Sequence, residues 1–143
     1  MLVAADGLHS PLRRAAGLDV ESAGPRRFGL RQHFRVAPWG ARVEVHFAGG
    51  VEAYVTPAGA QRVGVAFLWE DGAVERVRFD ALLARFPALA ERLAGAAPDS
   101  APRGAGPLLR RVRGRVADRF ALVGDAAGYV DAVTGEGLSL AFA

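Results

Sequence analysis

Apolar and polar residues alternate with a period of two through the middle of the chain. In the first such segment the apolar residues share one face of a strand: Phe28, Leu30, Phe34 and Val36. Gln32 is the polar exception on that face. The alternation recurs over residues 42–47 and 51–56, and residues 63–69 are almost continuously apolar. Glycine- and proline-containing turns separate the segments, so the pattern predicts an antiparallel meander of about four strands.

Helical spacing replaces the alternation after residue 78. Apolar residues then recur at i, i+3, i+4 and i+7: Phe79, Leu82, Leu83 and Phe86. Pro87 interrupts this line before Leu89 and Leu93 resume it. Residues 95–106 are rich in Ala, Pro and Gly and are expected to form a loop, and residues 107–116 are expected to form a strand.

The beginning of the chain predicts a strand, a turn and a helix. Residues 2–5 are expected to be the end of a buried strand, and Asp6-Gly7 is a turn signal. Ser10 suits the N-cap of a helix and Pro11 its first position. We expect this helix to run to about Ala16 and to end at Gly17.

Near the end of the chain, a short apolar segment leads directly into Gly124-Asp125. Residues 120–123 are expected to form a buried strand, followed by a loop. Gly135-Glu136-Gly137 then begins an apolar helix over residues 138–142. A carboxylate can accept hydrogen bonds from hydroxyl groups, and the start of a helix attracts negative charge. Gly124 and Gly128 can adopt positive φ without strain.

Composition excludes several classes of function. The chain of 143 residues contains no cysteine, so disulfides and thiolate metal sites are excluded. All 18 basic residues are Arg, which is typical of coding bias, and the Arg run over 110–115 lacks interleaved aromatic residues. We therefore expect no nucleic-acid partner. His33 and His46 are expected on polar strand faces, and no metal ligand set is predicted.

Targeting signals are also missing from the sequence. No apolar run approaches the ~20 residues that span a bilayer. Residues 1–5 are too short for a signal peptide and are followed at once by an acidic residue. We therefore expect a cytoplasmic protein without a transmembrane segment.

Two motifs resemble those of FAD-dependent monooxygenases and geranylgeranyl reductases, the p-hydroxybenzoate hydroxylase-like flavoproteins. Val123-Gly124-Asp125-Ala126-Ala127-Gly128, followed by Thr134-Gly135-Glu136-Gly137, is similar to the second flavin-binding motif of that family. Residues 2–14, with Asp6-Gly7, Ser10 and Arg13, are similar to its strand–Asp-Gly–x-x-Ser–x-x-Arg motif. The two motifs occur in the family's order and are separated by a β-rich segment, so the resemblance covers essentially the whole chain.

The resemblance implies an α/β fold, with a partial Rossmann-like FAD-binding domain and an antiparallel β-sheet substrate domain. Residues 1–24 and 107–143 would belong to the first domain and residues 25–106 to the second. Asp125 would bind the ribityl chain, and Gly135-Glu136-Gly137 would lie against the isoalloxazine. The implied cofactor-binding residues are Asp6, Gly7, Ser10, Arg13, Gly124, Asp125, Ala126, Ala127, Gly128, Thr134, Gly135, Glu136 and Gly137. No catalytic side chain is assigned, because the flavin supplies the redox chemistry.

The implied function is an FAD-dependent oxidoreductase. The options are an NAD(P)H-dependent monooxygenase, or a geranylgeranyl reductase-type enzyme, acting on an apolar or aromatic small molecule; a halogenase is a further option. Gln32, Tyr54 and Trp69 either face this substrate or pack within the sheet. A non-catalytic remnant or binding module that keeps the scaffold without the cofactor is the alternative.

The sequence departs from the family in two respects. Ala132 stands where many members have proline, so we expect a less rigid loop beside the flavin. The Gly-x-Gly-x-x-Gly fingerprint that holds the FAD pyrophosphate does not occur in the chain. We therefore expect a central fragment of a longer enzyme, which exposes an apolar sheet edge and binds FAD weakly or not at all on its own.

Overall fold

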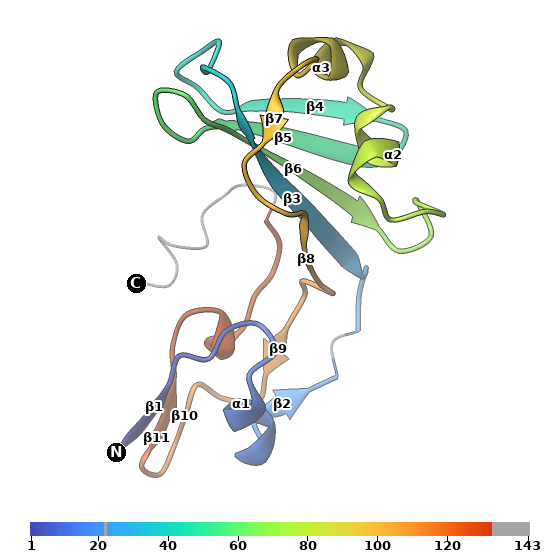
Figure 1. Ribbon diagram of the computed structural model, residues 1–143. Coiled ribbons are helices and arrows are strands. Elements are labelled where there is room, and N and C mark those ends of the chain that lie inside the picture. Colours follow the sequence, from blue (N-terminus) through green and yellow to red (C-terminus); the bar gives the residue numbers. More distant parts are fainter. Residues whose placement is uncertain (22, 133–143) are drawn as a thin grey trace. The chain divides into compact units, whose positions relative to one another are not determined.

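The computed structural model describes residues 1–21 and 23–132, and the chain divides into two compact units. Met1–Arg26 and Pro107–Ala143 belong to one unit, which we call the terminal unit. Arg27–Gly106 forms the other, the central unit, drawn from blue-green to orange in Figure 1. Within the described residues, no helix is long and apolar enough to cross a membrane.

A large antiparallel sheet forms most of the central unit. Its four long strands are β3 (Arg27–Arg35), β4 (Glu44–Ala48), β5 (Val51–Pro57) and β6 (Val63–Glu70). All four segments were predicted as strands from the alternation, and the structure confirms them. Their spatial order is β4-β5-β6-β3, so β3 lies beside β6 rather than beside β4 (Figure 1). The predicted meander is therefore confirmed for β4, β5 and β6 and wrong for β3, because alternation shows which residues share a face but not which strands are neighbours.

The free edge of β3 is covered by two short strands. These are β7 (Ala97–Pro98) and β8 (Arg103–Ala105), and both pair antiparallel with β3. The prediction of a loop over 95–106 is wrong for these residues. Between the two strands, the Asp99 N–H donates to the His33 carbonyl at 2.8 Å. Short segments of Ala, Pro and Gly have low strand propensity, and here an existing edge supplies their hydrogen-bond partners.

Two short helices pack on one face of this sheet and enclose its core. They are α2 (Phe79–Leu83) and α3 (Pro87–Arg92), with Pro87 at the first position of α3, where a missing N–H costs nothing. The ring of Phe67 on β6 lies 5.0 Å from that of Phe79 and 5.7 Å from that of Phe86. Trp69 is buried in the same cluster. Of the two roles considered for Trp69, the structure therefore shows sheet packing.

Strand β4 presents its polar residues to the helix-covered face. His46 shares the polar face of β4 with Glu44, as predicted, but this face lies opposite Ala53, a core residue, and is therefore the one turned toward the helices. The other face of β4 carries Val45 and Phe47, and Phe47 is 74% exposed. Polar residues are tolerated beside the core because β4 is an edge strand with charged partners: the carboxylate of Glu44 accepts from the Trp39 indole and from Arg92, at 3.0 and 3.2 Å.

The terminal unit contains two small sheets. In one, β1 (Leu2–Ala4) pairs parallel with β11 (Phe120–Leu122), which pairs antiparallel with β10 (Val116–Ala117). In the other, β2 (Asp19–Val20) pairs with β9 (Arg111–Val112). The single strand predicted over 107–116 is therefore replaced by two shorter ones. Leu2 and Val3 are about half exposed, which contradicts the expected burial of β1 except at Ala4.

Helix α1 (Pro11–Ala15) follows the predicted signals closely. Ser10 is its N-cap, and Pro11 is its first residue. The N–H of Gly17 donates to the Arg14 carbonyl at 3.0 Å, and Gly17 has φ of +65°. The predicted start and end of this helix are confirmed, because both are determined by local backbone chemistry.

Replacing Leu82 by Ala should lower the free energy of unfolding of the central unit by about 2–5 kcal/mol. Leu82 is fully buried between α2 and the sheet, and truncation would leave a cavity there. Denaturant titration followed by tryptophan fluorescence measures this, because both tryptophans, Trp39 and Trp69, lie in the central unit. Val77→Ala, at an exposed position, is the control and should change stability by less than about 0.5 kcal/mol. Equal effects of the two substitutions would contradict the assigned core.

Candidate functional site

The parallel pairing of β1 and β11 brings two loops to one edge of a sheet. Leu2 lies opposite Phe120 and Ala4 opposite Leu122, and the Val123 N–H extends the ladder by donating to the Ala4 carbonyl at 3.0 Å. Asp6-Gly7 follows β1, and Gly124-Asp125 follows β11. Both loops therefore leave the carboxyl ends of adjacent parallel strands, which is where open α/β sheets bind their ligands.

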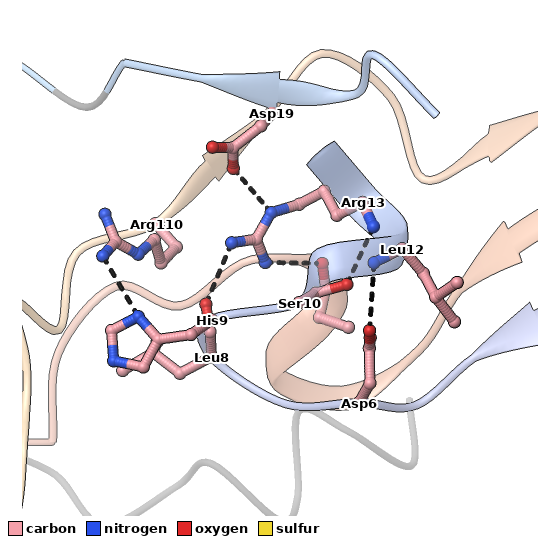
Figure 2. Close-up of polar contacts among 9 residues, drawn as sticks. Asp6, Leu8, His9, Ser10, Leu12, Arg13, Asp19 and Arg110 are labelled. Atoms are coloured by element: carbon pink, nitrogen blue, oxygen red, sulfur yellow. Dashed lines mark hydrogen bonds and ion pairs between the residues drawn. The ribbon is translucent and has the colours of Figure 1, made fainter. Parts of the chain in front are cut away.

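A buried arginine joins the two loops. The side chain of Arg13 is 1% exposed, and its guanidinium donates to three acceptors from different segments (Figure 2). Nε donates to the Asp19 carboxylate at 2.6 Å, Nη2 to the Leu8 carbonyl at 2.9 Å and Nη1 to the Ala126 carbonyl at 3.1 Å. The first loop, the start of β2 and the loop after β11 are thus fixed relative to one another.

The start of α1 is closed by side chains of the first loop. The Leu12 N–H donates to Asp6 Oδ2 at 3.2 Å, and the Arg13 N–H donates to Ser10 Oγ at 2.9 Å (Figure 2). Pro11 has no N–H, so the first turn leaves the N–H groups of Leu12 and Arg13 in need of partners, and both have one. The structure therefore gives Asp6 and Ser10 capping roles. Gly7 has φ of +81°, which explains glycine in this turn.

The second loop is a short 3-10 helix rather than the irregular loop predicted. This helix, η1 (Gly124–Ala127), begins at Gly124 with φ of +57°. Ala126 is fully buried beside Ala4 and Leu122, and Ala127 packs against the same cluster. Gly128 has φ of +120°, and a Cβ there would lie 3.3 Å from the Arg110 carbonyl oxygen. These constraints fix the backbone on either side of Asp125.

Asp125 is the carboxylate that this loop leaves available. Its side chain is exposed, and no hydrogen bond or ion pair of the described residues involves it. The Asp125 charge also affects Tyr129. Burial of the Tyr129 side chain raises its pKa, and the negative charges of Asp125 and Asp131 raise this pKa further. An exposed carboxylate on a rigid turn can accept hydrogen bonds from a ligand that carries hydroxyl groups.

The structure brings some of the predicted site residues together and not others. Arg13 contacts the Ala126 carbonyl directly, and Asp6 and Ser10 share the start of α1. Asp125 makes no described contact with either. Thr134, Gly135, Glu136 and Gly137 lie outside the described residues.

Sequence reasoning missed two groups that hold the site. Asp19, the ion-pair partner of Arg13, lies six residues further on and beyond the end of the helix, so no helical spacing indicates it. The Leu8 carbonyl is a backbone acceptor and leaves no trace in the sequence.

His9 and Arg110 also lie close together, with 3.4 Å between His9 Nδ1 and the Arg110 guanidinium. Over the described ranges, no cluster of three His, Asp or Glu side chains could hold a metal ion.

Tyr54 lies on the sheet face opposite the helices. Its hydroxyl donates to Glu52 Oε2 at 2.9 Å, and the other oxygen of Glu52 accepts from Arg27 at 2.6 Å. Gln32 lies on the helix-covered face, with its side-chain amide bonded to the Ser100 carbonyl at 2.9 Å. Tyr54 and Gln32 therefore face opposite sides of the sheet and cannot both line one site on it.

Several solved structures of flavoproteins have a fold similar to that of this chain. No protein-family model and no curated protein matches the sequence. Among solved structures, the flavin-dependent halogenase CmlS superposes with a TM-score of 0.83 at 21% identity, over 97% of this chain and 28% of that one. A flavoprotein/dehydrogenase from Cytophaga hutchinsonii superposes with a TM-score of 0.83 at 23% identity, over 97% of this chain and 37% of that one. The chain shares its fold with part of these flavoproteins.

A third structure contains the cofactor. The halogenase PltM, solved in complex with phloroglucinol and FAD, superposes with a TM-score of 0.81 at 21% identity, over 98% of this chain and 34% of that one. The chain thus spans about a third of the length of the solved proteins that it matches. At these identities the similarity establishes the fold, a mixed and sheet-rich one.

Replacing Arg13 by Ala should destabilise the terminal unit by roughly 2–4 kcal/mol, because it removes a buried charge and leaves three acceptors without their donor. Hydrogen exchange of the Leu122 and Val123 amides, both bonded within this unit, measures the effect. Arg14→Ala, at the exposed neighbouring position, is the matched control and should leave exchange nearly unchanged. If both variants exchanged equally fast, Arg13 would not be the residue that joins the loops.

The pKa of Asp6 should lie below its ordinary value of 3.8, chiefly because of the Ser10 hydroxyl and also because of the Leu12 N–H. A lowered pKa means that the ionised carboxylate stabilises the fold above the unfolded value of about 4, and that this contribution is lost as pH falls through the folded value. Titration by NMR should show the pKa of Asp6 rising in Ser10→Ala. The pKa of Asp99, lowered mainly by Arg35, should not move. An unchanged Asp6 pKa would contradict the capping arrangement.

Proposed function

We propose that the chain is part of an FAD-dependent oxidoreductase. The terminal unit would contribute to a Rossmann-like FAD-binding domain, and the central unit would be the substrate domain. The observation that carries this proposal is the pair of loops at the carboxyl edge of β1 and β11, with Asp125 exposed on one of them. The fold similarity to flavin-dependent halogenases and a flavoprotein/dehydrogenase supports it at the level of fold.

The residues of the site fit the ribityl part of a flavin. Ribityl hydroxyls are hydrogen-bond donors, and Asp125 is an acceptor without a described partner. At Gly7 and Gly124, no atom lies within 4 Å of the position a Cβ would take, so the backbone is open on that side. Asp125 would hold the chain of hydroxyls, and Arg13 would keep the Gly124–Ala127 turn in place through the Ala126 carbonyl. Bound FAD would supply the redox chemistry.

The reaction type is proposed from the sequence resemblance and the fold. An NAD(P)H-dependent monooxygenase or a reductase of the geranylgeranyl type, acting on an apolar or aromatic small molecule, is the main candidate. A flavin-dependent halogenase is the second candidate, favoured by the repeated fold similarity to enzymes of that name. Turnover assays separate these three outcomes: oxygen incorporation, saturation of an isoprenoid double bond, or halide incorporation.

The first test is to read the complete coding sequence at the native locus, because the chain spans about a third of the matched flavoproteins. An in-frame strand followed by Gly-x-Gly-x-x-Gly would supply the pyrophosphate site and support the proposal. A reading frame without any such fingerprint would instead favour a scaffold that has lost its cofactor.

Replacing Asp125 by Ala in the product of that reading frame should weaken FAD binding by roughly 10- to 100-fold, because a charge-assisted hydrogen bond is lost. Equilibrium titration by flavin fluorescence measures the affinity. Asp118→Asn removes the same charge at the turn between β10 and β11, at the opposite end of β11, and should leave the affinity unchanged. Failure of the unmodified protein to bind FAD, or equal effects of both variants, would overturn the proposal.

A further inference from the structure

A groove of about 560 Å³ lies between β3 and α2 in the central unit. Leu30, Gln32 and Phe34 of β3 form one wall, Phe79 and Leu83 of α2 form the other, and Pro102 contributes from the β7–β8 connection. This volume falls in the range of about 300–1,000 Å³ that is usual for small-molecule sites. All of the lining residues belong to one compact unit, so the groove is a property of the central unit itself.

Gln32 is the polar group inside this apolar groove. Its side chain is 8% exposed, and Nε2 donates to the Ser100 carbonyl at 2.9 Å. Because a carbonyl accepts only from the amide nitrogen, this bond determines the orientation of the amide group. The oxygen, Oε1, has no donor among the described residues and is not among the fully buried unpartnered atoms. It is therefore an accessible acceptor with a fixed direction.

The rim of the groove carries no unbalanced charge. Arg78 and Asp80 both border it, and they bind each other through two hydrogen bonds of 3.0 and 2.7 Å. A charged ligand would have to displace one of these partners, whereas a neutral ligand would not. The apolar walls favour burial of an apolar body, and a half-satisfied buried amide favours a ligand that completes its hydrogen bonding.

We propose that this groove binds a neutral, largely apolar small molecule of one or two rings that carries one hydrogen-bond donor directed at Gln32 Oε1. A hydroxyl or N–H on a flat ring system has this chemistry. The groove lies entirely within the central unit, so its binding chemistry is inferred from these lining residues and not from the flavin site proposed for the terminal unit.

Two probes with the same ring system, one with a hydroxyl donor and one with a methoxy group in its place, test the proposal: 2-naphthol and its methyl ether, 2-methoxynaphthalene. Both should bind to the full chain and shift the NMR signals of Gln32 and Leu83. The naphthol should bind roughly 3- to 10-fold more tightly, which is the usual effect of one hydrogen bond. In Gln32→Met this preference should disappear. Absence of binding by both probes, or equal affinity of the two for the unmodified chain, would overturn the proposal.

A second pair of variants locates the site without altering the buried amide. Val77 at the rim is 56% exposed and Val43, which does not line the groove, is 55% exposed. Val77→Trp should block the groove and abolish binding of 2-naphthol, and Val43→Trp should leave it unchanged. Equal behaviour of these variants would place the probe elsewhere and reject the groove. Groove signals that shift with protein concentration alone would show that a second copy of the chain occupies it, which would also overturn the proposal.

Discussion

The terminal unit depends on the burial of one guanidinium. A charge removed from water must be matched by hydrogen-bonding partners, and Arg13 obtains them from Asp19 and from two backbone carbonyls. The apolar cluster beside it is small: Ala4, Leu18, Leu122 and Ala126 are its buried members. With so little apolar surface to position the two loops, the directional bonds of Arg13 determine how the turn that carries Asp125 is presented.

The central unit is held together in a different way. Its core is built from apolar side chains on β5, β6 and the two helices, centred on the ring of Phe67. A polar residue is tolerated at the border of this core where it finds a hydrogen-bond partner. Gln32 occupies such a border position, where the β7–β8 connection satisfies only half of its amide. The terminal unit is thus held by the hydrogen bonds of Arg13, and the central unit by an apolar core.

Much of the secondary structure could be predicted because its signals are local. Ser10, Pro11 and Gly17 define α1 through capping chemistry, and period-two alternation defines the four long strands. The pairing of β3 with β6 and the recruitment of β7 and β8 depend on contacts distant in sequence, which alternation does not encode. In the site, Arg13 and Asp6 could be singled out by their motif. Asp19 could not, because its role arises only after the chain turns back at Gly17.

The chain enters and leaves the central unit at neighbouring points. Gly29 of β3 lies opposite Ala105 of β8, and Gly106 packs so closely on Phe28 that a Cβ there would lie 2.6 Å from its ring. Loop closure costs more entropy as the closed segment lengthens, but the pairing of β3 with β8 already holds these two ends together in the folded central unit. We therefore expect changes of length within the central unit to leave the chain path of the terminal unit unchanged, as long as β3 and β8 stay paired.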